Sequence, residues 1–103
     1  MLPVDPLVRH DPARQRYELD TEHGTAVAVY RQQGDRRVFV HTETPPRDEG
    51  KGVASRLVKA ALDDSKAAGF RIVPACSFVV SYVSRHPAYR DWSQSEEARY
   101  REI

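Results

Sequence analysis

The amino-acid sequence predicts one α+β domain in which helices pack on a mixed β-sheet. Three strand-like segments come first, and a segment with helical spacing of its apolar residues follows them. A short apolar strand and a second apolar, helix-like segment come next, so the expected order is β-β-β-α-β-α. A connection of strand, helix and strand favours a mixed sheet, because parallel neighbours require a crossover.

The length and composition limit the classes of protein to consider. With 103 residues and a formal charge of +1, the chain is large enough for one modest core and lacks the bulk charge typical of a nucleic-acid binder. No apolar run approaches the ~20 residues of a membrane span, and the N-terminus lacks the apolar centre of a secretion signal. The single cysteine predicts a free thiol and a cytoplasmic protein. No Cys/His spacing typical of a metal site occurs.

The first half of the chain is expected to form an extended arm followed by antiparallel strands. Residues 1–15 contain three of the seven prolines and predict the arm. Residues 14–20 and 25–32 are strand candidates separated by the turn-like "TEHG", and "QGD" at 33–35 predicts a hairpin turn.

The third strand candidate, residues 36–44, alternates between two faces. The pattern predicts Val38, Val40 and Thr42 on one face and Phe39, His41 and Glu43 on the other. Pro45 and Pro46 end this strand, because proline cannot donate to the ladder.

The second half of the chain begins with the clearest helix. Its apolar and small residues fall at helical spacing: Ala54, Leu57, Val58, Ala61, Leu62 and Ser65. Gly69 fits the end of this helix. Residues 70–76 predict a short buried strand that ends at Pro74, and residues 77–86 return to a helix-like pattern. The tail, residues 93–103, is charged.

A glycine-spaced loop, "EGKG", lies directly before the helix. Gly50 and Gly52 allow backbone amides to approach a ligand closely, and a helix that begins there adds unpaired N–H groups and the positive end of its dipole. These features predict an anion site, although a plain tight turn explains the glycines as well. The spacing excludes the P-loop, and the Rossmann fingerprint would need a third glycine after Gly52.

The loop resembles the acetyl-CoA loop of GNAT-type N-acetyltransferases, whose pattern is Gln/Arg-x-x-Gly-x-Gly/Ala at the start of a long helix. Aligned on the helix, Glu49, Gly52 and Ala54 occupy the three specified positions, and Glu49 replaces the usual Gln or Arg. A literal match through Arg47, Gly50 and Gly52 also exists, but it shifts the helix face.

The surrounding segments resemble one small GNAT-like group that lacks the usual N-terminal helices. These segments are "HTETPP", "ALDDSKAAGFRIVPACSFV" and "RHPAYRDW". The resemblance covers residues 16–92 and leaves out the arm, 1–15, and the tail, 93–103. It implies a GNAT-like fold, a mostly antiparallel twisted sheet with two helices packed on it.

The resemblance also implies acetyl-CoA or CoA as the ligand. The loop amides of this family hold the pyrophosphate, and the preceding strand holds the pantetheine arm. The implied binding residues are Thr42, Glu43, Thr44, Glu49, Gly50, Lys51, Gly52, Val53, Ala54, Ser55 and Arg56. The side chains of Lys51 and Arg56 either pair with CoA phosphates or face water.

Three sets of side chains are candidates for the acetyl-transfer chemistry. The resemblance implies a catalytic role for Cys76, as a nucleophile or as a thiol beside the CoA sulfur; a buried small apolar residue is the alternative. His41 and Glu43 are candidates for the base, or are structural. Tyr82 lies on the segment that carries the usual GNAT acid, but its spacing favours core packing.

Two functions of different classes follow from these residues. The first is transfer of an acetyl group from acetyl-CoA to an amine of a protein or a small molecule. The second is a CoA-binding module without catalysis, which Glu49 and the tyrosine spacing favour. Missing N-terminal helices leave an open site that suits a macromolecular acceptor or a completing partner. The sequence leaves open whether the protein is a monomer or a dimer.

Overall fold

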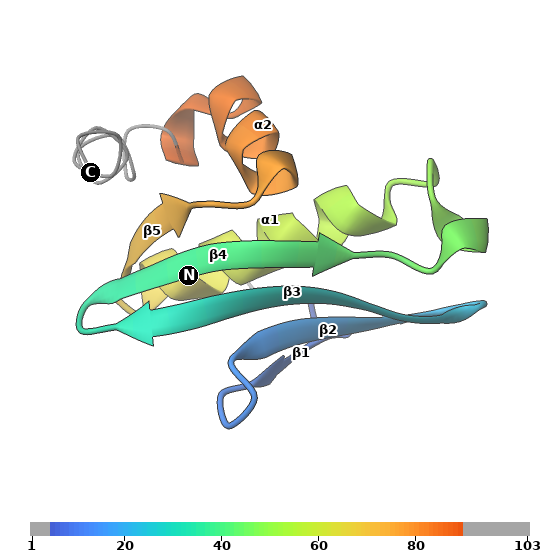
Figure 1. Cartoon of the computed structure of the whole chain (residues 1–103), viewed down its shortest axis with the longest axis horizontal. Helices are drawn as coiled ribbons and strands as arrows, with labels where there is room; N and C mark the ends of the chain where they lie inside the picture. The colour runs from blue at the N-terminus through green and yellow to red at the C-terminus, as the bar shows by residue number, and fades with distance from the viewer. Residues whose placement is uncertain (1–4, 90–103) are drawn as a thin grey trace.

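The computed structural model describes residues 5–89 as a five-stranded sheet with two α-helices (Figure 1). The strands lie in sequence order across the sheet. They are β1 (Val8–Asp11), β2 (Arg16–Thr21), β3 (Gly24–Gln33), β4 (Arg36–Glu43) and β5 (Arg71–Pro74). The first four are antiparallel neighbours, and β5 is parallel to β4. The expected α+β class and mostly antiparallel sheet are confirmed.

Strand β1 corrects the expected order of elements, because it lies within the segment assigned to an extended arm. Val8 pairs with Leu19 and Asp11 pairs with Arg16, so this short strand forms one edge of the sheet. The sequence pattern missed it because four residues flanked by prolines are too few to show alternation.

The crossover from β4 to β5 contains the 3₁₀ turn η1 (Pro46–Asp48) and helix α1 (Val53–Ala67). The N–H of Phe70 donates to the Ser65 carbonyl and the N–H of Gly69 to the Lys66 carbonyl, which is a Schellman ending. Gly69 has φ +86° and lies where the sequence predicted the helix end.

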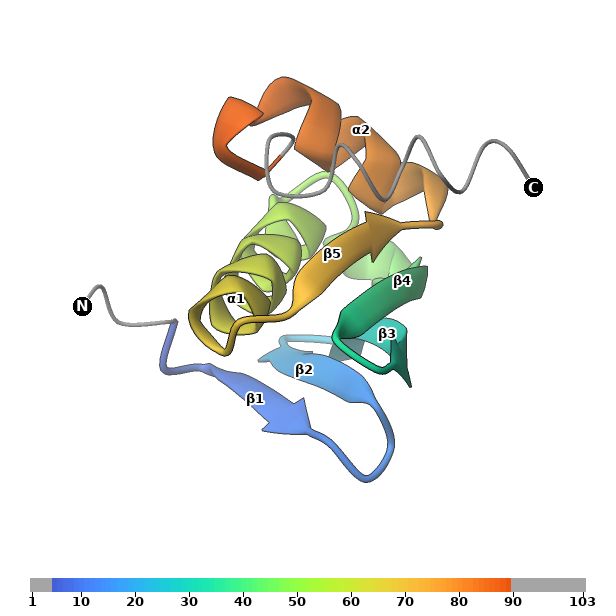
Figure 2. The ribbon, with the colours of Figure 1, turned by 90° about the vertical axis from the view of Figure 1, so that its left-hand side faces the viewer.

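Helix α2 (Ser77–Arg85) follows β5 directly, as the apolar pattern of residues 77–86 predicted. The sheet curves around α1, and α2 lies beside β5 and the end of β4 (Figure 2). Both helices join the sheet in one apolar core. Its fully buried members include Tyr17, Tyr30, Phe39, Leu57, Leu62, Ile72, Val79 and Val83.

A bulge in β4 corrects the predicted faces of that strand. Tyr30 pairs with Phe39, whereas Val29 pairs with His41, so Val40 is an extra residue without a partner on β3. An extra residue reverses the alternation that follows it. Phe39 and Thr42 therefore share the core face, and His41 and Glu43 lie on the opposite face from Phe39, contrary to the regular alternation.

Candidate functional site

The candidate site is a pocket of about 390 Å³ where the end of β4, the glycine loop and the two helices meet. Its walls are the residues Thr42, Thr44, Asp48, Glu49, Gly50, Gly52, Val53, Ala54, Ser55 and Phe78. Nine of these ten come from the strand end, the loop and the first turn of α1, and Phe78 comes from α2. Eight of the eleven expected cofactor-binding residues line the cavity, and the three that do not are Glu43, Lys51 and Arg56.

The glycine loop presents the start of α1 to this pocket. Gly50 and Gly52 have φ values of +82° and +80°, a left-handed conformation that glycine adopts without strain. Gly52 is the N-cap of α1, and no side chain caps the helix. A Cβ built on either glycine meets no atom within 4 Å, so the space beside the loop is open. The uncapped helix start therefore offers N–H groups and a positive dipole end to an anion.

Asp48 connects the loop to the β2–β3 turn through hydrogen bonds. Its carboxylate is only 3% exposed and accepts hydrogen bonds from the Thr21 hydroxyl, from His23 Nδ1 at 3.0 Å and from the His23 backbone N–H at 3.3 Å. These donors, Thr21 first, lower the pKa of Asp48 to about 2. The sequence did not indicate Asp48, because the burial of this carboxylate depends on a turn 25 residues away that no local pattern reveals.

Among the described residues, three side chains near the loop carry atoms of the kind that bind metal ions. Ligating atoms of Glu22, His23 and Asp48 lie within 4.8 Å of one another. However, Asp48 is already hydrogen-bonded to His23, and Lys51 Nζ lies 3.7 Å from its Oδ1. A nearby ammonium opposes a second cation, so the arrangement is better explained as a hydrogen-bonded fastening of the loop.

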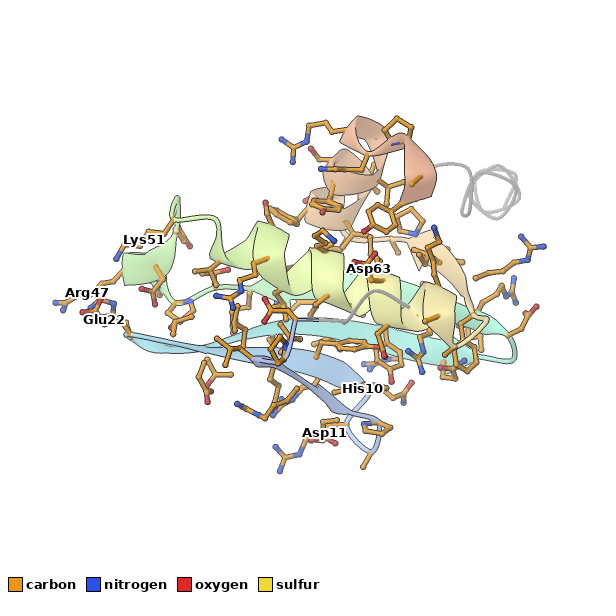
Figure 3. All side chains as sticks on the ribbon, turned by 180° about the vertical axis from the view of Figure 1, so that it is seen from behind. His10, Asp11, Glu22, Arg47, Lys51 and Asp63 are labelled. Atoms are coloured by element: carbon orange, nitrogen blue, oxygen red, sulfur yellow. The ribbon has the colours of Figure 1, made fainter. Side chains whose placement is uncertain are left out.

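Lys51 and Arg56, the two side chains that could pair with CoA phosphates, have different surroundings. Lys51 lies at the loop end of the molecule, together with Arg47 and Glu22 (Figure 3). The Arg56 guanidinium is turned instead to Asp5, through Nε to Oδ2 and through Nη2 to Oδ1 at 3.1 Å. Both cations line a smaller hollow beside the pocket, of about 300 Å³, rather than the pocket itself.

The carboxyl end of β4 separates from β5 beside the pocket. The β4–β5 ladder ends where Phe39 pairs with Pro74, and the Ala75 N–H then donates to the Phe39 carbonyl at 3.0 Å. Strand β4 continues to Glu43, beyond the end of β5 (Figure 1). This end of β4 therefore runs along the pocket without β5 beside it.

His41 and Glu43 lie together, but not on the pocket side of this strand. His41 Nε2 is 3.8 Å from Glu43 Oε1, and the two side chains are 59% and 66% exposed. Thr42 pairs with buried Ala28 and faces the core side, so its two neighbours along the strand face away from it. The structure brings the two candidate bases together and separates them from the pocket by the thickness of the sheet.

Cys76 is the N-cap of α2, directly after β5, and its side chain is partly buried against the core. Its Sγ lies 3.5 Å from Thr42 Oγ1. Burial by itself would raise the pKa of the thiol, but hydrogen bonds from Thr42 and from the N–H groups of Val79 and Phe78 outweigh it. The pKa of Cys76 is therefore below its ordinary value.

Tyr82 packs in the core, as its spacing favoured. The side chain is 4% exposed, and its ring stacks on the His86 ring with centroids 3.9 Å apart. The phenol belongs to the apolar cluster beneath α2 and does not line the pocket. Burial raises the pKa of Tyr82, which opposes its ionisation.

The fold and this pocket define a class of protein, the GNAT-type N-acetyltransferase domains. The glycine loop lies between the end of β4 and the uncapped start of α1, as the resemblance implied. The family of GCN5-related N-acetyl-transferases matches residues 16–92, and the chain belongs to this family.

The relatives are small proteins of similar length. Over 83 residues the chain is 35% identical to protein NATD1 of Homo sapiens. This match covers 78% of this chain and 74% of that protein. The identity to protein NATD1 of Gallus gallus is also 35%, with 76% of that protein covered. The fold matches the solution structure of a GCN5-like protein from Staphylococcus aureus with a TM-score of 0.61 over 90% of both chains, at 17% identity.

Within residues 5–89, no helix has both the length and the apolar character needed to cross a bilayer.

Proposed function

We propose that this chain binds acetyl-CoA in the loop pocket and transfers the acetyl group to an amine. The uncapped start of α1, with two left-handed glycines beside open space, is the observation that carries this proposal. Its N–H groups and dipole suit the pyrophosphate of CoA. The backbone of Thr42, Glu43 and Thr44 runs from the loop toward Cys76 and suits the pantetheine arm.

The acetyl end of the ligand then lies near Cys76, which has two roles open to it. As a nucleophile, its thiolate forms a bond from Sγ to the acetyl carbon while the bond from that carbon to the CoA sulfur breaks. CoA leaves as the thiolate. The amine later attacks the acetyl carbon of the acetyl-cysteine and releases the Cys76 thiolate. Alternatively, the amine attacks acetyl-CoA directly, and the Cys76 thiol gives its proton to the departing CoA sulfur.

The proton lost by the amine requires a base on the acceptor side of the site. His41 and Glu43 lie together on the exposed face of β4, opposite Thr42. In direct transfer, these two side chains could take the proton only through water, because the thickness of the sheet separates them from the pocket. The open face suits an amine on a macromolecule or a site completed by a partner.

A CoA-binding module without catalysis is the second candidate function. Glu49 lines the pocket with a carboxylate where the family pattern has Gln or Arg, and Arg56 is engaged by Asp5. Both features place less positive charge at the pocket than a strong phosphate site would have.

The binding step is tested by calorimetry with CoA on the parent chain and on Gly52→Asn. Asparagine tolerates the left-handed backbone, so this change places a side chain in the open space with little strain. We expect the Kd for CoA to rise at least about tenfold, or about 1.4 kcal/mol.

Gly34→Asn is the matched control. Gly34 also has a positive φ and open space, but it lies in the β3–β4 turn, outside the residues that line the pocket. The loop assignment is wrong if folded Gly52→Asn binds CoA as tightly as Gly34→Asn does.

The release of CoA thiol in the presence of a panel of amines separates the enzyme from the binding module. Intact mass of the parent chain and of Cys76→Ala after exposure to acetyl-CoA shows whether Cys76, the one cysteine in the chain, carries an acetyl group. Binding without thiol release for any amine, peptide or protein acceptor would favour the module.

A further inference from the structure

The Cys76 sulfur lies among hydrogen-bond donors from two separate elements. Thr42 contributes its hydroxyl, at 3.5 Å, and its backbone N–H from β4. Phe78 and Val79 contribute backbone N–H groups from the first turn of α2. In its neutral form the thiol donates to the Thr42 hydroxyl oxygen; once it is ionised, the hydroxyl must be the donor.

Thr42 reaches this position because of the bulge at Val40. The pairing of Tyr30 with Phe39 and of Ala28 with Thr42 puts both β4 residues on the core side. A regular strand would have put Thr42 on the side opposite Phe39. The end of the β4–β5 ladder at Pro74 then leaves room for the Cys76 side chain beside Thr42.

Thr42 is also a wall of the loop pocket, whereas Cys76 itself is not among the lining residues. Thr42 therefore contacts both the pocket and the sulfur. We propose that Thr42 is a positioning residue, which holds the Cys76 sulfur beside the pocket through its hydroxyl and backbone N–H.

This role deepens the proposed function and depends on it only for the identity of the ligand that reaches the sulfur. A sulfur held by several donors has a fixed position and orientation, which attack on an electrophile requires. Thr42 acts through Cys76 and takes no part in bond formation.

Among residues 5–89, no charged side chain is a leading influence on the Cys76 sulfur. The leading influences on the thiol are burial and the donors of Thr42, Phe78 and Val79, and none of these is a charged side chain. On β4, His41 and Glu43 face the opposite side. On the remaining neighbours, Glu49 lines the loop wall of the pocket, and the first turn of α2 carries no acidic residue.

The test is the pH profile of Cys76 alkylation by iodoacetamide, followed by intact mass without any acetyl-CoA. We expect Thr42→Val to raise the midpoint of the profile by about half a unit to one unit, because the thiolate loses the hydroxyl donor. The midpoint is a better measure than one rate, since a thiol of higher pKa is also more nucleophilic and recovers part of the loss. At neutral pH the rate should fall about two- to threefold.

Thr42→Ser restores a hydroxyl and should return the midpoint to that of the parent chain. Thr25→Val is the matched control, because Thr25 lies on β3 and its hydroxyl donates to Asp20 instead. If Thr42→Val disturbs the fold, Thr42→Ala also removes the hydroxyl and gives the same comparison of midpoints with the parent chain. The proposal is overturned if folded Thr42→Val or Thr42→Ala has the parent midpoint, or if Thr42→Ser behaves as Thr42→Val does.

Calorimetry with CoA on the same proteins separates this inference from the proposed function. If the parent chain fails to bind CoA, the proposed function fails, and a raised midpoint in Thr42→Val still supports the role of Thr42. If CoA binds and the midpoint is unchanged, the role of Thr42 fails alone.

Discussion

At the residue scale, a buried arginine organises the polar contacts near the end of α1 that is remote from the loop. Arg37 is 6% exposed and donates through Nη1 to the Tyr17 hydroxyl at 2.6 Å and to Ser65 Oγ at 3.2 Å. Its Nε donates to Gln32 Oε1, and Tyr17 in turn donates to Asp64. Because a buried charge is costly unless its donors are satisfied, these contacts allow Arg37 to lie inside the domain.

His10 lies at the edge of this network. Its ring stacks on Tyr17 with centroids 4.2 Å apart, and Nε2 is 2.6 Å from the Tyr30 hydroxyl. Burial, together with the charge of Arg37, lowers the pKa of His10, while Asp64 and Asp11 oppose the shift.

This lowered pKa predicts an acid-sensitive contribution to stability. The unfolded state binds the His10 proton more readily than the folded state, so the stabilisation is present above the unfolded pKa of about 6.5 and is lost as pH falls below it. Urea unfolding of the parent chain at several pH values should therefore show a steeper loss of stability on acidification than His10→Gln shows. The other histidines are common to both proteins, so their effects cancel in the difference. Equal slopes for the two proteins would contradict the assignment.

At the scale of elements, β1 adds an edge strand to the sheet and packs on the core. Strand β1 covers Tyr17 and Tyr30 through His10, and the residues before β1 reach α1 through the pair of Asp5 and Arg56. The family match begins at residue 16, after this strand. The sheet of this chain therefore includes a strand, β1, that lies before the matched residues.

Removal of residues 1–11 should lower the free energy of unfolding by about 2 kcal/mol or more. The hydrogen bond of His10 accounts for about 1 kcal/mol and its stacked ring for about 0.5–1.5 kcal/mol. Urea unfolding measures the loss, and His10→Ala in the full chain measures the side-chain part of it separately. A truncated chain as stable as the parent would mean that β1 contributes nothing to the sheet.

At the scale of the whole molecule, the pocket joins elements that are distant in the sequence. Thr42 comes from β4, Gly52 from the start of α1 and Phe78 from α2, so a ligand in the pocket contacts the sheet and both helices together. A ligand bound in this way binds the folded state and has no equivalent site on the unfolded chain.

CoA should accordingly raise the unfolding free energy, by about 2.7 kcal/mol when the free ligand is a hundredfold above its Kd. Thermal and urea unfolding at increasing CoA concentration measure this effect. Pantetheine lacks the pyrophosphate and should stabilise much less at the same concentration, because the loop N–H groups then have no anion to bind. Equal stabilisation by both compounds would contradict the assignment of the pyrophosphate to the loop.

The sequence predicted the elements whose signals are local. The helical spacing from Ala54 to Ser65, the ending at Gly69 and the stop at Pro74 all depend on residues within one or two turns of each other. The glycine loop was recognisable for the same reason, because backbone freedom at Gly50 and Gly52 is a property of those residues themselves.

The sequence by itself determined the α+β class, the order of most elements and the position of the glycine loop, because periodicity, proline and glycine act over a few residues. Only the tertiary structure decided that Val40 is a bulge residue, that Thr42 meets Cys76 and that His41 and Glu43 face the other way. It also decided that Asp48 is buried by His23 and that Arg56 is turned to Asp5. The physical reason is that a bulge and a long-range contact depend on how whole strands pair and pack, and a strand's own alternation carries no record of its partner's register.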